Sequence, residues 1–159
     1  MGQKSLLFFD TLVGKIDSKG RVCIPASYRS SFEKTETDLV VFRSFNKPCI
    51  ECCSSLLLEN LAQGIEDTLS LFSEEQETLA DLIYADAHAF VFDSTGRIGL
   101  SQKLISHASL TDTVAFVGKG RTFQIWNPEL YEKENNLIRQ KALSKKTSLP
   151  VFSLRKKEQ

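Results

Sequence analysis

An internal repeat is the feature that most constrains how this chain can fold. The stretch IDSKGRVCI at 16–24 returns as FDSTGRIGL at 92–100, so both copies hold Asp-Ser-x-Gly-Arg followed by alternating apolar residues. Two weaker similarities follow along the chain: residues 38–42 correspond to 112–116, and residues 50–53 correspond to 123–126. Repetition of this kind marks a duplicated unit that cannot bury its apolar face alone. The sequence therefore predicts two copies, over 5–60 and 86–135, which close a shared core.

Each copy has the pattern of a small β-rich unit. Apolar residues alternate over 12–16 and again over 22–24, which predicts two short strands. The residues between them suit a hairpin turn in which Gly20 takes a left-handed backbone conformation and the Asp17 carboxylate accepts backbone N–H groups. Pro25 then opens a short helix, and a second hairpin follows. The predicted fold class is α+β and rich in β-structure.

The segment between the two copies is different in kind. Apolar residues at helical spacing, with a capping-box pattern at 73–76, predict an acidic helical connector over 61–85. After the second copy, Pro128 is expected to start another helix. Residues 136–159 should then form the end of that helix and a mobile basic tail.

The formal net charge is zero, with 20 basic and 20 acidic side chains, which on its own argues against a general binder of polyanions. That sum hides a segregation of charge. Residues 54–90 hold eight acidic and no basic side chains, whereas 1–53 and 132–159 each hold an excess of basic ones. The distribution therefore permits a nucleic-acid partner away from the connector.

Other sequence features limit where the protein can be located and which chemistry it can perform. No apolar run approaches the ~18 residues of a membrane span, and the first apolar stretch is too short for a secretory signal. The cysteines lack a secretory context, so reduced thiols in a cytoplasmic protein are expected. The cysteine cluster at 49–53 has no second half-site for zinc, and no catalytic set of side chains emerges. We therefore expect no metal, no cofactor, no small-molecule substrate and no enzymatic activity.

The 49–53 cluster has a simpler interpretation as part of a strand. It corresponds to the strand of the second copy that ends at Trp126. Adjacent residues of a strand point to opposite faces, so at most one of Cys52 and Cys53 is expected in the core.

The doubled turn carries the functional signal. A single Asp-x-x-Gly-Arg is most simply a hairpin with a solvated arginine. Here Arg21 and Arg97 occupy the same position after equivalent turns. A pseudo-two-fold relation between the copies would therefore place both arginines on one surface. The guanidinium group is suited to paired hydrogen bonds with phosphate oxygens or with guanine O6 and N7.

These residues resemble a known family. The segments DSKGR at 17–21, IPASYR at 24–29, DSTGR at 93–97 and FQIWN at 123–127 are similar to MraZ, a family related to the AbrB/SpoVT swapped-hairpin DNA-binding proteins, over residues of about 5–135. The resemblance implies two tandem swapped-hairpin β-barrel units in one chain and ring-shaped homo-oligomers. It also implies a bacterial transcriptional regulator, associated with the nucleoid, that binds double-stranded DNA at G-rich direct repeats upstream of division and cell-wall genes.

The turn chemistry, together with this resemblance, suggests a role for each candidate residue. Arg21 and Arg97 are expected to read guanine edges, while Lys19 and Arg29 contact phosphates. The turns are expected to be structured by Asp17, Gly20, Asp93 and Gly96. The second copy departs from the pattern, because Ile105 stands where the first copy has Arg29, and Lys103 is the expected partial substitute. An alternative stays open, an oligomeric interaction protein of the same fold whose acidic connector docks a basic partner with little DNA sequence preference.

Overall fold

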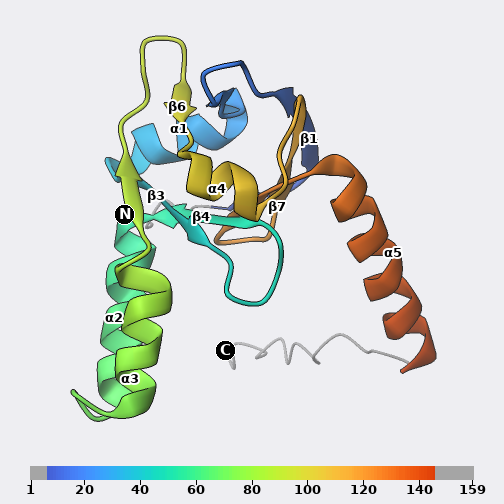
Figure 1. Ribbon diagram of the computed structural model, residues 1–159. Coiled ribbons are helices and arrows are strands. Elements are labelled where there is room, and N and C mark those ends of the chain that lie inside the picture. The colour runs from blue at the N-terminus through green and yellow to red at the C-terminus, as the bar shows by residue number, and fades with distance from the viewer. Residues whose placement is uncertain (1–6, 146–159) are drawn as a thin grey trace, which may run out of the picture. The chain divides into compact units, whose positions relative to one another are not determined.

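A computed structural model describes residues 7–145, and the predictions for the tail beyond Lys145 lie outside them (Figure 1). The chain divides into two units, residues up to Pro128 and residues from Glu129 onward. The elements, in chain order, are β1 (Thr11–Lys15), β2 (Arg21–Cys23), α1 (Ala26–Thr35), β3 (Leu39–Arg43), β4 (Ile50–Ser54), α2 (Ser55–Thr68), α3 (Glu74–Leu79), the π-helical turn η1 (Ala80–Tyr84), β5 (His88–Phe90), β6 (Arg97–Gly99), α4 (Gln102–His107), β7 (Thr113–Gly118), β8 (Phe123–Trp126) and α5 (Pro128–Ser144). The α+β, strand-rich class predicted from the sequence is confirmed.

The strands form a six-stranded antiparallel sheet and a separate two-stranded ribbon. The sheet order is β1-β7-β8-β4-β3-β5, and the ribbon pairs β2 with β6. β1 of the first copy pairs with β7 of the second, and β5 of the second pairs with β3 of the first. Each copy therefore contributes an edge strand to the other copy. As a result, the sheet is symmetric: each strand of the first copy and its equivalent in the second copy lie at the same distance from the middle of the sheet.

Two registers locate the pseudo-two-fold axis that relates the copies. In the ribbon, Val22 lies opposite Ile98, and the repeat makes these two residues equivalent. In the sheet, β4 pairs with β8 so that Glu51 lies opposite its own equivalent, Gln124. Gln124 Nε2 donates to Glu51 Oε1 at 2.9 Å. Because equivalent residues face each other at both places, the axis passes through the ribbon and through the middle of the sheet.

Both copies contribute to one apolar core, as the sequence predicts. The inward residues of the ribbon, Val22 and Ile98, are 0% and 3% exposed. They belong to the same buried cluster as Phe32 of α1, Leu104 of α4 and Phe123 of β8. This pattern follows from the alternation of side chains along a strand, since the residues on either side of Val22 in β2 and of Ile98 in β6 are partly or fully exposed.

The expectation for the two adjacent cysteines is wrong, because both are buried. Cys52 faces the main core at 0% exposure, and Cys53 lies on the other face of the sheet at 5%. There Cys53 packs in a second cluster with Val40, Phe42 and Ile83, against side chains of the connector. The sheet is therefore covered on both faces at this point, which an alternation pattern alone does not reveal.

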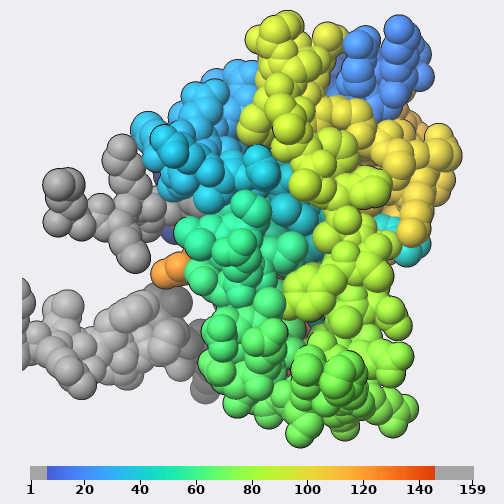
Figure 2. All heavy atoms as spheres, turned by 90° about the vertical axis from the view of Figure 1, so that its left-hand side faces the viewer, coloured from blue at the N-terminus to red at the C-terminus, as the bar shows by residue number. Residues whose placement is uncertain are grey.

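The connector forms α2, α3 and η1, and local signals explain its helix starts. Ser54 and Ser73 are the N-caps of α2 and α3, and each hydroxyl accepts the backbone N–H three residues on. The connector helices lie at one end of the body, and the two Asp-Gly-Arg turns lie at the other (Figures 1 and 2). Within residues 7–145, no helix is long and apolar enough to cross a membrane.

Candidate nucleic-acid interface

The first turn is held by its own aspartate. Asp17 Oδ1 accepts the backbone N–H groups of Lys19 and Arg21, both at 2.9 Å. Gly20 closes the turn by donating to the Asp17 carbonyl at 3.0 Å, with φ of 78°. The second carboxylate oxygen accepts Arg21 Nε at 2.7 Å. One aspartate therefore shapes the turn and fixes the direction in which the arginine leaves it.

The second turn repeats this arrangement. Asp93 Oδ1 accepts the backbone N–H groups of Thr95 and Arg97, both at 2.9 Å, and Arg97 Nε donates to Oδ2 at 3.1 Å. Gly96 has φ of 79°. The second turn has one bond more than the first, from the Thr95 hydroxyl to Asp93 Oδ1 at 2.8 Å.

These hydrogen bonds keep both carboxylates charged. The backbone N–H of Arg21 lowers the pKa of Asp17, and the backbone N–H of Arg97 does the same for the pKa of Asp93. The arginine side chain and, for Asp93, the Thr95 hydroxyl lower the pKa further. Each turn is therefore a preformed ion pair at neutral pH.

The turns are joined to each other across the pseudo-two-fold axis. Ile24, just after β2, donates its backbone N–H to the Gly96 carbonyl at 3.1 Å. Leu100, just after β6, donates to the Gly20 carbonyl at 2.8 Å. The two turns consequently lie side by side at one end of the body (Figure 2). Neither can shift without disturbing the strand of the other copy.

Both arginines lie on the outer face of the β2–β6 ribbon. Arg21 is opposite Gly99, and Arg97 is opposite Cys23, while the inward pair between them is buried. Strand rise and strand spacing place the two arginine Cα atoms ~8 Å apart. The residues beside them on this face are small, a glycine and a cysteine, so the guanidinium groups are the largest features of the ribbon surface.

The surroundings of the two turns differ. At the second turn, Arg29 reaches over from α1 and donates Nη1 to the Thr95 carbonyl at 3.0 Å. At the first turn, the equivalent position is Ile105, whose Cδ1 would lie 3.0 Å from a Cβ on Gly20. A hollow of about 390 Å³ lies beside the first turn, between it and α4. The first turn is thus open on the side where the second is covered by a guanidinium.

Lys103 is not placed with the other predicted residues. Its Nζ lies 3.2 Å from Asp86 Oδ1, and the Asp86 side chain is only 8% exposed. Arg43 Nη2 donates to the same oxygen at 2.7 Å, and this side-chain contact lowers the pKa of Asp86. The Arg43–Asp86 pair was not predicted from the sequence. The repeat contains no signal for it, because Val117 occupies the equivalent of Arg43 in the second copy.

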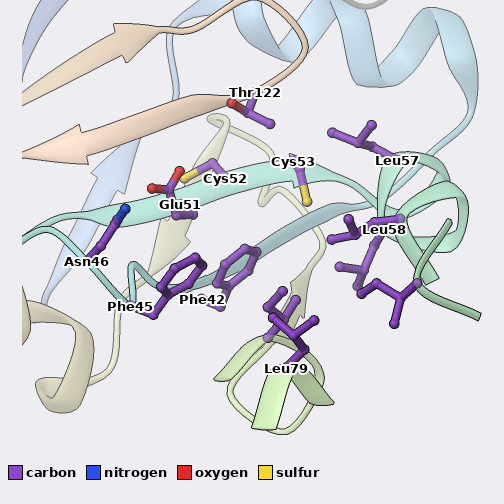
Figure 3. A pocket seen from close by; sticks show the side chains of 13 residues that line it. Phe42, Phe45, Asn46, Glu51, Cys52, Cys53, Leu57, Leu58, Leu79 and Thr122 are labelled. Atoms are coloured by element: carbon purple, nitrogen blue, oxygen red, sulfur yellow. The ribbon is translucent and has the colours of Figure 1, made fainter. Parts of the chain in front are cut away.

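An apolar groove of about 430 Å³ lies at the opposite end, between the sheet and the connector helices (Figure 3). The Phe42 and Phe45 rings lie together on the sheet side, with Leu79 of α3 across from them. Leu61 of α2 lines the groove and remains 41% exposed. An open apolar lining beneath acidic helices is suited to binding an apolar segment rather than to catalysis.

The clustered cysteines Cys49, Cys52 and Cys53 are buried. Burial raises the pKa of Cys49 to about 12 and that of Cys53 to about 11, which keeps both as neutral thiols. Across the described part of the chain, no three His, Cys, Asp or Glu side chains gather in a way that could hold a metal ion.

The fold and the turns define a class, proteins with an interlaced β-rich repeat that present two Asp-anchored arginines on one exposed ribbon. A family model described as "MraZ protein, putative antitoxin-like" matches residues 83–148. The protein named transcriptional regulator MraZ of Pelagibacter ubique (strain HTCC1062) is 42% identical over 144 residues, covering 90% of this chain and 92% of that protein. The chain belongs to the MraZ family.

Other relatives of the same name agree in extent. The transcriptional regulator MraZ of Gluconobacter oxydans (strain 621H) is 42% identical over 146 residues, covering 89% of this chain and 88% of the relative. That of Rickettsia canadensis (strain McKiel) is 36% identical over 144 residues, covering 90% and 96%. The matched length spans both copies of the repeat. These relatives are named as regulators of transcription and not as enzymes.

Proposed function

We propose that this protein is a DNA-binding transcriptional regulator that recognises G-rich direct repeats through the two turns of the β2–β6 ribbon. The observation that carries the proposal is the presence of Arg21 and Arg97 on one outer face of that ribbon. The relatives' name, transcriptional regulator, supports the general activity. The family resemblance supplies the target, the promoter region of a division and cell-wall gene cluster.

The ribbon has a suitable shape for reading base pairs. A major groove of about 12 Å admits a two-stranded β-ribbon, and several regulators read DNA with one. A separation of ~8 Å between the arginine Cα atoms corresponds to about two to three base steps of 3.4 Å. Both arginines can therefore face the same stretch of one groove.

The ion pairs favour base recognition over phosphate binding by the arginines. Each aspartate neutralises its arginine and takes up Nε, which leaves the two terminal nitrogens to donate to guanine O6 and N7. Phosphate attraction then falls to cations without a carboxylate partner. We assign this role to Lys19 and Arg29. Lys103 pairs with Asp86 and lies apart from the two turns, so we propose it only as a weaker phosphate contact, made through a side chain that stays 62% exposed.

We also propose that the fold is the swapped-hairpin arrangement of AbrB-like proteins, with its two units at 5–60 and 86–135. The exchange of edge strands between copies supports this. One chain covers only a few base pairs, so useful affinity requires several chains of a ring to engage successive repeats. A light-scattering mass should exceed that of a single chain several-fold, and a monomer at working concentration would exclude the ring.

The charge distribution fits a cytoplasmic, nucleoid-associated protein. The acidic connector lies at the end of the body away from the turns (Figure 1), so the six carboxylates of 61–85 are distant from a DNA bound at the ribbon. A chain with no net charge can therefore present a locally basic surface to DNA.

The test is a comparison of G-rich direct repeats with scrambled DNA of equal length, over a salt series. The wild type should prefer the repeats. Arg21→Ala and Arg97→Ala should each lose about 1–3 kcal/mol of that preference, the usual value of one paired arginine–guanine contact. Arg121→Ala, at an exposed arginine between β7 and β8 and outside the ribbon, serves as a charge-matched control. Equal binding to both DNAs, or alanine variants with unchanged preference, would contradict the proposed function.

The groove favours a second candidate function, an interaction protein whose acidic connector docks a basic partner. The groove is apolar, and the helices that flank it carry acidic side chains and no basic ones. Such a surface suits an amphipathic helix with apolar residues at i, i+3, i+4 and i+7 and flanking lysines.

A labelled leucine–lysine peptide of that pattern tests the second candidate by fluorescence anisotropy. It should bind more tightly than a scrambled peptide of the same composition, and Leu61→Glu in the groove should weaken it. Leu137→Glu on α5, also exposed, is the control. Equal binding of both peptides would reject the docking surface. If the groove instead mediates self-association, Leu61→Glu would lower the mass measured by light scattering.

A further inference from the structure

We propose that Arg29 of the first copy serves the turn of the second copy, where it supplies the phosphate-binding cation that Lys19 supplies to the first turn. This assignment rests on the proposed function. It makes Arg29 a residue of the Arg97 site, although 68 positions separate the two in the chain. The two turns then carry equal charge from unequal sources.

The contact that supports this crosses the pseudo-two-fold axis. Arg29 lies in the first turns of α1, and its Nη1 donates to the Thr95 carbonyl at 3.0 Å. A Cβ atom placed on Gly96 would collide with the Arg29 guanidinium. The absence of a side chain at Gly96 therefore has two uses, a left-handed turn and room for a guanidinium from the other copy.

The differences between the copies are complementary. Where the first turn has Lys19, the second has Thr95, whose hydroxyl is directed back to Asp93 at 2.8 Å. Where α1 has Arg29, α4 has Ile105, which packs against the core beside Gly20. Each turn thus has one cation beyond its neutralised arginine, but the second turn receives that cation from the first copy.

Both cations are available to a phosphate. Lys19 is exposed, and Arg29 is partly exposed. Within residues 7–145 neither forms an ion pair with a carboxylate. A guanidinium has five N–H donors, and the bond to the Thr95 carbonyl occupies one of them. The others can meet phosphate oxygens while that bond holds the group above the turn.

A purely structural role for Arg29 makes a different prediction from a phosphate contact. Loss of a brace lowers affinity but leaves the salt dependence unchanged. Loss of a phosphate contact lowers the slope of log K against log salt by about 0.9 for each contact removed. The salt slope therefore separates the two roles even when both variants bind less tightly.

The experiment measures DNA binding of the full chain to G-rich direct repeats over a salt series. Arg29→Gln keeps a hydrogen-bond donor toward Thr95 but removes the charge, and Arg29→Ala removes both. Lys19→Ala is the reference variant. It gives the change in the slope of log K against log salt that follows from removing one cation per chain, whatever the number of chains bound to the DNA. We expect Arg29→Gln to lower the slope by the same amount as Lys19→Ala, and Thr95→Lys added to Arg29→Gln to restore it.

The outcomes are distinct. An unchanged slope for Arg29→Gln, or a slope that Thr95→Lys does not restore, would overturn the assignment while leaving the proposed function intact. A wild type that does not bind the repeats would overturn the proposed function itself, and this assignment with it. Thermal unfolding of each variant shows whether it is folded. If Arg29→Ala fails to fold, Arg29→Gln alone decides the question.

Discussion

The two turns share one sequence pattern and one internal geometry, yet they differ in what surrounds them. In both, an aspartate binds two backbone N–H groups and the arginine that follows. Only the second is covered by a guanidinium from the other copy, whereas the first borders a hollow. The shape of such a turn is therefore encoded locally, within five residues, while its electrostatic environment depends on the way the copies interlock.

The largest expected difference between the two turns is in the free energy of unfolding lost when the turn glycine is replaced by alanine. Alanine at Gly20 or Gly96 must adopt a left-handed backbone conformation, which costs about 1–3 kcal/mol. A Cβ on Gly20 would also lie 2.9 Å from the Leu100 carbonyl oxygen, part of the backbone, whereas at Gly96 it would meet the Arg29 side chain, which can move. Gly20→Ala should therefore lower the free energy of unfolding more than Gly96→Ala does, by about 1 kcal/mol.

Urea denaturation of both alanine variants checks this prediction. Gly96→Ala should instead show its effect in DNA binding, because it displaces Arg29, and its salt slope should match that of Arg29→Gln. Equal stabilities for the two variants would show that the Leu100 carbonyl relaxes as easily as a side chain.

A smaller effect is expected in the coupling between residues. Arg29 holds the second turn, so its removal should loosen Arg97 and leave Arg21 largely unaffected. A double-mutant cycle in DNA binding should give a coupling of about 0.5–1 kcal/mol between Arg29 and Arg97 and none between Arg29 and Arg21. Coupling of equal size to both arginines would mean that Arg29 acts on the body as a whole.

The smallest difference lies in the acid titration of the two aspartates. Because the folded pKa of each is lowered, its contribution to stability is complete above the ordinary carboxyl pKa of about 3.9 and is lost as the pH falls through the folded value. Thr95→Val removes one hydrogen bond and should raise the pKa of Asp93 alone. Carboxyl NMR titration measures this, with Asp17 as the internal control; a shift of both aspartates would show that the turns are coupled.

The sequence predicted the parts that depend on near neighbours. The strands, the short helix after Pro25, the N-cap at Ser73 and the shared core all follow from spacing and turn chemistry within a few residues. The chain also showed through its repeat that two arginines would be equivalent. These features need no knowledge of how the copies meet.

Features that depend on contacts between distant segments could not be predicted in this way. The burial of both Cys52 and Cys53 arises because the connector covers the second face of the sheet. The bond of Lys103 to Asp86 and that of Arg29 to Thr95 join segments with no shared pattern. Which edge strand pairs with which copy is likewise a property of the assembled sheet, not of any one strand.

Substitution of guanine by 7-deazaguanine in the direct repeats tests the central claim most directly, because it removes the N7 acceptor and changes little else. The wild type should lose about 0.5–1.5 kcal/mol of binding free energy for each substituted contact, because O6 still accepts one of the two hydrogen bonds. The Arg21→Ala/Arg97→Ala double variant should bind the natural and substituted DNA equally. A wild type indifferent to the substitution, or a double variant as sensitive as the wild type, would contradict the claim that these two arginines read guanine.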